Sequence, residues 1–385
     1  MRKQTEAASL ASNFGMLLLQ SLRPPSLLRV PPIRWLIRAA YVLATVQFAG
    51  VYYFLAKNYL DYTRYEYGYE RLPFQTRVLL APFLRWADNN EQLVRYASHL
   101  SAHSYYFPDG IAPQDVALFF LNIVSVLIAG WVAVRLYSAA SRRKLAGEFV
   151  YPVFLCLCVV TYILHTTQNF RFVYDLPNLT LFSIGLYLIY FRKPVLWFCV
   201  LFAIATLNRE TSLLLLPFFV TSQVVDGEGR PRWKRVFSST VLGVVIPLFA
   251  YWIIWHLMIF HIFRSNPSEY YSRIITNLLS LRSLRNYPQI FSALGYLPIF
   301  LLLYRRRIHD PQIRAWMWML PVWSGFMYVW GVIVETRIFG ELIAYTACVG
   351  IILAEEVIAS RLALQERASM AEEQYQAEEA NARAA

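Results

Sequence analysis

Long apolar runs, separated by short polar segments, occupy most of this 385-residue chain. A helix needs roughly 20 apolar residues to cross a bilayer, and several of the runs reach that length. The composition agrees, because 57% of the residues are hydrophobic and only 16% are charged, unlike an ordinary soluble protein. The runs therefore predict an all-α, polytopic membrane protein built as a bundle of helices.

About ten runs qualify as transmembrane helices when segments that pack together are allowed to be somewhat shorter. They cover roughly residues 35–56, 114–138, 149–167, 176–191, 194–207, 212–225, 237–263, 288–304, 313–334 and 342–360. We expect a cytoplasmic tail at 1–32, a polytopic domain at 33–362 and a polar cytoplasmic tail at 363–385. A long outer loop at 57–113 belongs to the polytopic domain.

Clusters of arginine and lysine set the expected orientation. Basic residues collect on cytoplasmic loops, and they occur here at 142–144, 192–193, 230–235 and 305–307. Placing these clusters inside puts both termini in the cytoplasm, and it accounts for the net charge of +12 without a nucleic-acid partner. Segment 264–287 is an exception to this rule, because it carries several arginines although the alternation of spans places it on the outer side of the membrane. Arginines on that face suit an anionic partner.

The stretch Leu207–Thr211 places an arginine and a glutamate between two apolar runs. An ionised side chain is costly there unless it is paired or hydrated. Basic flanks lie on both sides of the pair of runs, so the chain crosses an even number of times between them. Two short crossings with Arg209 and Glu210 at an outer turn fit this rule, and so does one re-entrant hairpin. A salt bridge that holds two helix ends explains the two charges, and so does a substrate site.

Other charged residues fall on the same outer face, at the ends of expected spans. Guanidinium groups suit an anion because they stay charged and offer paired donors. Carboxylates beside them are able to orient the arginines. The predicted substrate-binding residues are Arg77, Asp175, Arg209, Glu210, Glu335 and Arg337.

The segments Pro73–Leu79, Tyr174–Pro177, Asn208–Thr211 and Glu335–Phe339 lie on this outer face in that order. Together they resemble a group of bacterial multi-pass proteins related to the GT-C superfamily of lipid-phosphate-sugar glycosyltransferases. The likeness covers roughly residues 35–360. It implies a GT-C-like fold with a large first outer loop and interfacial helices.

The resemblance also implies a reaction. Such enzymes take a sugar from a polyprenyl phosphate at the outer leaflet and invert its anomeric centre. One carboxylate soon after the first span deprotonates the acceptor, and cations stabilise the leaving phosphate. That carboxylate falls on Asp61, with Glu66 and Glu70 as alternates, so Asp61 and Glu66 are the predicted catalytic residues.

The chain departs from the family in lacking a clear paired-acid motif in the first outer loop. This departure leaves open whether a divalent cation takes part. The four cysteines lie inside apolar runs, and no histidine pair has metal-ligand spacing with a carboxylate. We therefore name no metal-binding residue.

Two other classes of protein remain compatible with the sequence. One is a transporter or lipid flippase, which the interrupted runs around Arg209 favour and the lack of a second interrupted pair disfavours. The other is a non-catalytic subunit of envelope-polysaccharide assembly. Each interpretation has the lipid bilayer as partner and a multi-pass location, in the plasma (inner) membrane if the source is bacterial. The enzyme interpretation adds a polyprenyl-phosphate-linked sugar.

Overall fold

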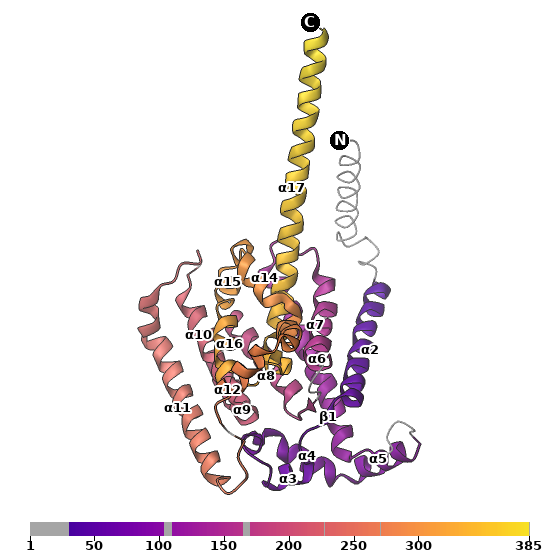
Figure 1. Ribbon diagram of the computed structural model, residues 1–385, viewed down its shortest axis with the longest axis vertical. Helices are drawn as coiled ribbons and strands as arrows, with labels where there is room; N and C mark the ends of the chain where they lie inside the picture. Colours follow the sequence, from indigo (N-terminus) through magenta and orange to yellow (C-terminus); the bar gives the residue numbers. More distant parts are fainter. Residues whose placement is uncertain (1–30, 104–109, 165–169, 227, 270, 385) are drawn as a thin grey trace.

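The computed structural model describes residues 31–103, 110–164, 170–226, 228–269 and 271–384, and it is almost entirely helical (Figure 1). Its α-helices are α2 (Pro31–Leu55), α3 (Tyr62–Tyr67), α4 (Ala81–Asp88), α5 (Glu91–His103), α6 (Pro113–Ala140), α7 (Gly147–Tyr162), α8 (Asp175–Tyr190), α9 (Val195–Asn208), α10 (Leu215–Val224), α11 (Ser239–Ile262), α12 (Ile274–Arg282), α13 (Tyr287–Ser292), α14 (Leu297–Tyr304), α15 (Pro311–Trp316), α16 (Met319–Trp330) and α17 (Ile343–Ala384). The predicted all-α class is confirmed.

Short 3-10 helices and one pair of strands complete the described part. The 3-10 helices are η2 (Phe74–Thr76), η3 (Val78–Leu80), η4 (Glu210–Leu214), η5 (Trp233–Phe237), η6 (Leu284–Asn286), η7 (Ala293–Tyr296), η8 (Arg305–Arg307) and η9 (Thr336–Leu342). The strands β1 (Lys57–Asn58) and β2 (Phe170–Arg171) pair in parallel.

Within the described residues, five helical segments are long and apolar enough to cross a membrane. They are Trp35–Tyr53, Pro113–Ala140, Ser239–Ile262, Leu284–Arg307 and Thr336–Glu378. Each coincides with one of the predicted spans. Several apolar membrane-length helices are thus a property of the structure as well as of the sequence, and they indicate a membrane protein.

The other five predicted spans form helices that are shorter or interrupted. Helices α7 and α8 have 16 residues each, α9 has 14 and α10 has 10. The predicted span 313–334 is divided between α15 and α16. The end of the predicted span 149–167 lies outside the described residues. Length alone therefore supports five crossings among the described helices.

The main core lies where α6, α7, α8 and α17 pack together, with α2 against α6 and α7. Small side chains on α6 allow this close approach. A Cβ added to Gly130 would lie 2.3 Å from the ring of Tyr151 on α7, so the glycine is required for the α6–α7 contact. This packed centre holds α8 and the segments at its N-terminal end in place.

The predicted outer loop 57–113 forms a cap of short helices over one end of the bundle, and Figure 1 shows α3, α4 and α5 there. A second apolar cluster joins this cap to α6 and to the segment before α8, through Leu60, Tyr65, Leu84, Leu118 and Tyr174. Within this cap, the segment Val78–Asp88 forms η3 and α4. Its apolar side contributes Leu84 and Ala87 to the buried interior.

Helix α17 leaves the bundle at the end opposite the cap (Figure 1). It continues without a break through residue 363, where we expected the polar tail to begin. The predicted N-terminal tail lies almost wholly outside the described residues.

A buried carboxylate fastens α17 to the loop between α6 and α7. Glu355 is 5% exposed, and it accepts hydrogen bonds from Ser141 Oγ (2.7 Å), from the backbone amide of Ala146 (2.6 Å) and from the hydroxyl of Tyr137. Three donors satisfy one carboxylate, so the charge is tolerated inside the protein. The sequence pattern did not identify Glu355 as a structural residue.

We expect Glu355→Ala to lower the free energy of unfolding by about 2–4 kcal/mol, because Ser141 and the Ala146 amide lose their acceptor. The neighbouring Glu356 is a matched control, since its side chain is 12% exposed and contacts two more exposed cations, Arg143 at 3.4 Å and His309 at 3.5 Å. Glu356→Ala should cost less than about 1 kcal/mol. Unfolding in detergent micelles measures both values, and equal losses would contradict the assignment.

Candidate functional site

The break between α9 and η4 positions the two central charged residues. Arg209 has extended backbone angles (φ −162°, ψ 144°), which end α9 and start η4 in a new direction. Its amide still donates to the carbonyl of Ala205 (2.9 Å), so the guanidinium sits at a helix C-terminus, where a cation is favoured. The interrupted pair of runs predicted from the sequence is confirmed as two helices with a turn between them.

Arg209 lies between two buried carboxylates. Its Nη1 is 3.5 Å from Asp175 Oδ1 and 3.2 Å from Glu341 Oε1. Asp175 is the first residue of α8, where the helix N-terminus favours an anion. All three side chains are at most 6% exposed. The burial makes each charge dependent on the others.

Neutral side chains complete the surroundings of Glu341. Asn178 Nδ2 donates to its Oε1 at 2.5 Å, and the Thr211 hydroxyl donates to the same oxygen at 2.9 Å. Asn208 donates to the carbonyl of Tyr174 (3.2 Å). The network therefore links α8, the α9–η4 turn and η9, which are far apart in the sequence.

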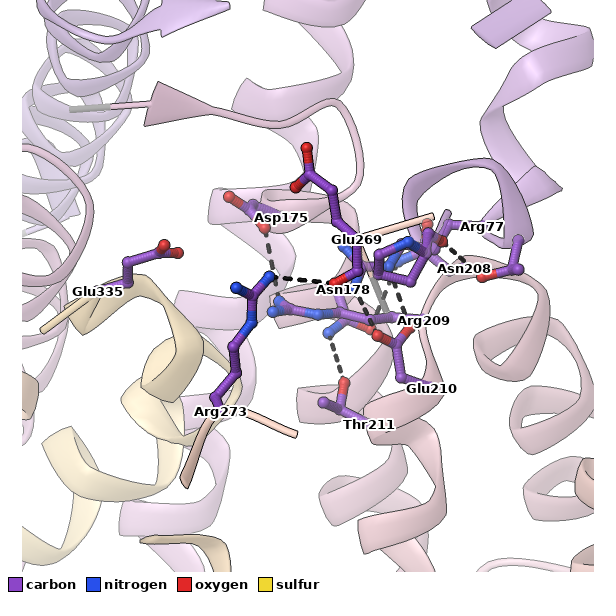
Figure 2. Close-up of polar contacts among 12 residues, drawn as sticks. Arg77, Asp175, Asn178, Asn208, Arg209, Glu210, Thr211, Glu269, Arg273 and Glu335 are labelled. Carbon is purple, nitrogen blue, oxygen red and sulfur yellow. Dashed lines mark hydrogen bonds and ion pairs between the residues drawn. The ribbon is translucent and has the colours of Figure 1, made fainter. Parts of the chain in front are cut away.

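Arg77 from the cap forms a bidentate pair with Glu210. Its Nε lies 3.0 Å from Oε2 and its Nη2 lies 2.5 Å from Oε1 (Figure 2). Its guanidinium also covers the ring of Tyr174 at 4.3 Å. Burial raises the pKa of Glu210, but the charge and hydrogen bonds of Arg77 outweigh burial and lower the pKa to about 2. Glu210 is thus a weak proton acceptor at neutral pH.

Arg337 and Glu335 form a third pair at the start of η9. The Nη2 of Arg337 donates to Glu335 Oε2, and its Nη1 lies 3.5 Å from Asp175 Oδ2. The guanidinium stacks over the ring of Phe172 at 3.9 Å. All six predicted substrate-binding residues consequently belong to one connected cluster, with Glu341 as a further member.

The net charge of the cluster bears on whether it is a salt-bridge network or an anion-binding site. Three arginines (Arg77, Arg209 and Arg337) face four carboxylates (Asp175, Glu210, Glu335 and Glu341), which leaves 3 − 4 = −1 if all are ionised. The arginines are already paired, so the cluster itself has no surplus positive charge for an anion. The salt-bridge alternative accounts for the buried part, Arg209 with Asp175 and Glu341.

Two adjoining cavities open beside the cluster. The smaller, about 110 Å³, is lined by all three arginines and by Glu335, and the larger, about 330 Å³, by Glu269, Tyr271 and Trp252. Six residues line both: Pro73, Arg77, Glu210, Arg273, Phe326 and Trp330. We call the two cavities together the cleft. Asp175 and Glu341 line neither cavity, and they contact the arginines from outside the cleft.

Arg273 differs from the other arginines of the cleft. Its Nη2 contacts only a backbone carbonyl, that of Glu269 (3.3 Å), and its guanidinium stacks on the ring of Tyr271 at 3.9 Å. None of the carboxylates in the described ranges forms an ion pair with it. Figure 2 shows Arg273 reaching toward the cluster from a separate segment. It is therefore the arginine of the cleft that pairs directly with no carboxylate of the described residues, although its charge offsets the net negative charge of the neighbouring cluster.

Two guanidinium donors beside the smaller cavity lack a hydrogen-bond acceptor among the described residues. They are the Nε of Arg209 and the Nη1 of Arg337, although Nη1 lies near Asp175. Buried donors of this kind are costly unless a partner is bound. Both residues line the cavity, but each of these two atoms exposes less than 1 Å², so a ligand in the cavity reaches them only if the side chains move.

The two predicted catalytic residues lie in the cap, and neither lines the cleft. Asp61 caps α3 by accepting from the Arg64 amide (3.1 Å), and its side chain is 53% exposed. Glu66 is buried and accepts from Gln114 Nε2 (3.0 Å). Burial raises the pKa of Glu66. The structure gives both residues local contacts within the cap and α6.

Glu70, the other alternate, is also buried in the cap, where its carboxylate accepts from the amides of Asp61 (3.1 Å) and Arg71 (3.0 Å). Arg71 in turn pairs with Glu269 at 2.8 Å, so the cap reaches the cleft through this arginine.

Sequence reasoning missed four polar residues of the cluster and the cleft. Asn178 and Glu341 belong to apolar stretches, and the only available signal was their polarity within those runs. Arg273 and Glu269 lie in the arginine-bearing segment 264–287, whose unusual charge was noticed without any residue being chosen.

No group of three or more histidine, cysteine, aspartate or glutamate side chains is placed to hold a metal ion within the part of the chain that the structure describes. No protein-family model matches the chain, and neither a curated protein nor a solved structure matches it. The function of the protein is therefore inferred from the cleft and its residues.

Proposed function

We propose that the protein binds a polyprenyl-phosphate-linked sugar in the cleft and transfers the sugar to an acceptor at the outer face of the membrane. The GT-C-like character of the fold is part of this proposal. In it, the shorter helices also cross, which makes about ten crossings with both termini in the cytoplasm. The observation that carries the proposal is Arg273, an arginine without a carboxylate partner in a cleft beside the membrane helices.

A phosphate group is the ligand chemistry that this arginine suits. A guanidinium offers several donors to phosphate oxygens and remains charged at every physiological pH. Arg273 is held by stacking on Tyr271, so its donors are partly pre-positioned.

The walls of the larger cavity suit a lipid-linked donor. Phe249 and Trp252 from α11 line it, together with Phe326 and Trp330 from α16. Helix α11 is apolar, and much of its surface is exposed, as at Ile254 and Leu257, which is expected of a helix that faces lipid. A prenyl chain on that surface would place its phosphate near Arg273. Aromatic faces also suit a sugar ring.

Glu269 is the proposed general base. Its side chain is 33% exposed and lines the larger cavity beside Arg273. Arg71 holds it at 2.8 Å, an arrangement that orients a carboxylate toward an acceptor hydroxyl. Glu210 suits this role less, because Arg77 occupies both of its oxygens.

Arg273→Gln should weaken binding of polyprenyl phosphate by about 10- to 100-fold, because one charged hydrogen-bonding group is lost. Tryptophan fluorescence measures this affinity in nanodiscs, since Trp252 and Trp330 line the cleft. Polyprenol without phosphate should bind wild type and variant equally. Sugar transfer from a panel of polyprenyl-phosphate sugars then tests the reaction, with a raised KM expected for the variant.

Arg282→Gln is the matched control, since Arg282 is exposed at the end of α12 and lines neither cavity. It should bind and react as wild type does. Equal affinity of wild type and Arg273→Gln for polyprenyl phosphate would refute the phosphate assignment. Binding without transfer from any donor would refute the transferase and favour a transporter or flippase.

A further inference from the structure

A separate cavity of about 600 Å³ lies away from the cap, where η5, η8 and α15 meet the end of α10. Figure 1 shows α10 and α15 at the end of the bundle from which α17 emerges. Arg305, Arg306 and Arg314 line this cavity, which we call the basic pocket. It shares no residue with the cleft.

The three arginines are not neutralised by carboxylates. Within the described ranges none of them forms an ion pair. Arg305 stacks over the ring of Trp318 at 4.6 Å, and Arg314 makes only a long contact of 3.4 Å with the carbonyl of Ile308. Arg306 is exposed. The basic pocket thus concentrates positive charge, which favours an anionic ligand.

Acidic residues nearby are engaged elsewhere. Asp226 pairs with Arg232 at 3.1 Å, and Glu228 contacts Arg230 at 3.4 Å, both within the loop after α10. Asp310 caps α15 by accepting from the amide of Ile313 (2.8 Å), and it accepts from the hydroxyl of Tyr190 (2.8 Å). None of these three carboxylates lines the pocket.

The walls of the basic pocket are held together without a ligand. Trp316 and Gln312 on α15 both donate to the Ser222 hydroxyl on α10, at 2.8 Å and 3.0 Å. Gly229 has a positive φ (+81°), and a Cβ there would lie 2.1 Å from Arg314 Nη2. The loop backbone therefore lies against the end of the Arg314 side chain, in a conformation that favours glycine. Little reorganisation would be needed for binding.

The rest of the lining is apolar and aromatic. Val220, Val224 and Met319 form part of the wall, and Trp233 and Trp318 are 70% and 53% exposed. Exposed tryptophans are typical of the boundary between hydrocarbon and headgroups. A pocket that combines arginines with an apolar wall at this depth matches both parts of a phospholipid, and basic pockets between membrane helices bind anionic headgroups in other proteins.

We propose that the basic pocket binds the headgroup of an anionic glycerophospholipid, with its phosphate on Arg305, Arg306 and Arg314 and its acyl chains along α10 and α16. The site is independent of the cleft and of the reaction proposed there. The bound lipid would tie the loop after α10 to α15.

Native mass spectrometry tests the proposal on full-length protein released from vesicles of phosphatidylglycerol and phosphatidylcholine. Wild type should retain phosphatidylglycerol in preference to phosphatidylcholine. Each arginine near an anionic headgroup changes affinity about fivefold. Arg306→Gln should therefore reduce retention about fivefold, and the double variant Arg305→Gln with Arg314→Gln should reduce it by more than tenfold. Thermal unfolding checks that each variant is folded, and Arg306→Gln suffices if the double variant is not.

Arg142→Gln is the matched control, because Arg142 is exposed in another basic cluster and does not line the pocket. It should retain the lipid as wild type does. Equal loss with Arg142→Gln would show diffuse charge attraction and overturn the site. Unchanged retention in Arg306→Gln, equal retention of both lipids, or displacement by millimolar inorganic phosphate would overturn it too.

Discussion

Arg209→Met should destabilise the protein by about 3–5 kcal/mol, the cost of leaving buried charges without their partner. Asp175 and Glu341 flank the guanidinium and are 0% and 1% exposed. Methionine keeps the apolar volume and removes the charge. Much of the protein is then expected to be lost during purification, and the midpoint of thermal unfolding in detergent should fall for the remainder.

A second substitution separates charge from packing. Glu341→Gln removes one of the two stranded carboxylates and keeps its shape, so the double variant with Arg209→Met should recover part of the lost stability. The two changes should couple by about 0.5–3 kcal/mol, as contacting residues do. Arg209→Met at wild-type stability, or strictly additive effects of the two changes, would refute the buried salt-bridge network.

Glu269→Gln should lower kcat for sugar transfer by about 10²–10⁴-fold, the usual contribution of a positioned general base. Binding of polyprenyl phosphate should change little, because Arg273 and not Glu269 carries the phosphate contact in the proposal. Measured kcat and KM distinguish a base, whose loss lowers kcat, from a binding residue, whose loss raises KM.

Asp61→Asn and Glu66→Gln are the informative comparisons, because the resemblance to GT-C enzymes implies that one of these carboxylates is the base. Neither lines the cleft, so both variants should keep transfer within about tenfold of wild type, far less than loss of a general base would cost. Loss of transfer in either, with activity retained in Glu269→Gln, would place the base in the cap and reject Glu269.

The charges at Arg209 and Glu210 allowed two interpretations, a structural salt bridge and a substrate site. Arg209 belongs to a buried salt-bridge network, which is structural. Arg77 and Glu210 stand at the edge of the cleft, together with Arg273, which pairs with no carboxylate among the described residues. The convergence of charges on one face was predictable, whereas the pairing of each arginine was not.

The number of membrane-length helices is another feature that the sequence predicts only in part. Apolar runs marked all ten segments as helical, yet α9 and α10 are shorter than a span because Arg209 turns the backbone between them. The span expected at 313–334 is likewise divided between α15 and α16. Hydropathy indicates whether a segment prefers the membrane or water, but it does not indicate where the backbone changes direction.

The sequence by itself determined the class of protein: a helical membrane bundle with charged turns on one face. Length, apolarity and charge are properties of neighbouring residues, so they can be read along the chain. Only the tertiary structure decided that Glu341, 132 positions after Arg209 (341 − 209), pairs with its guanidinium, and that no carboxylate among the described residues pairs with Arg273. An ion pair depends on distance in space and on burial, and neither follows from position in the sequence.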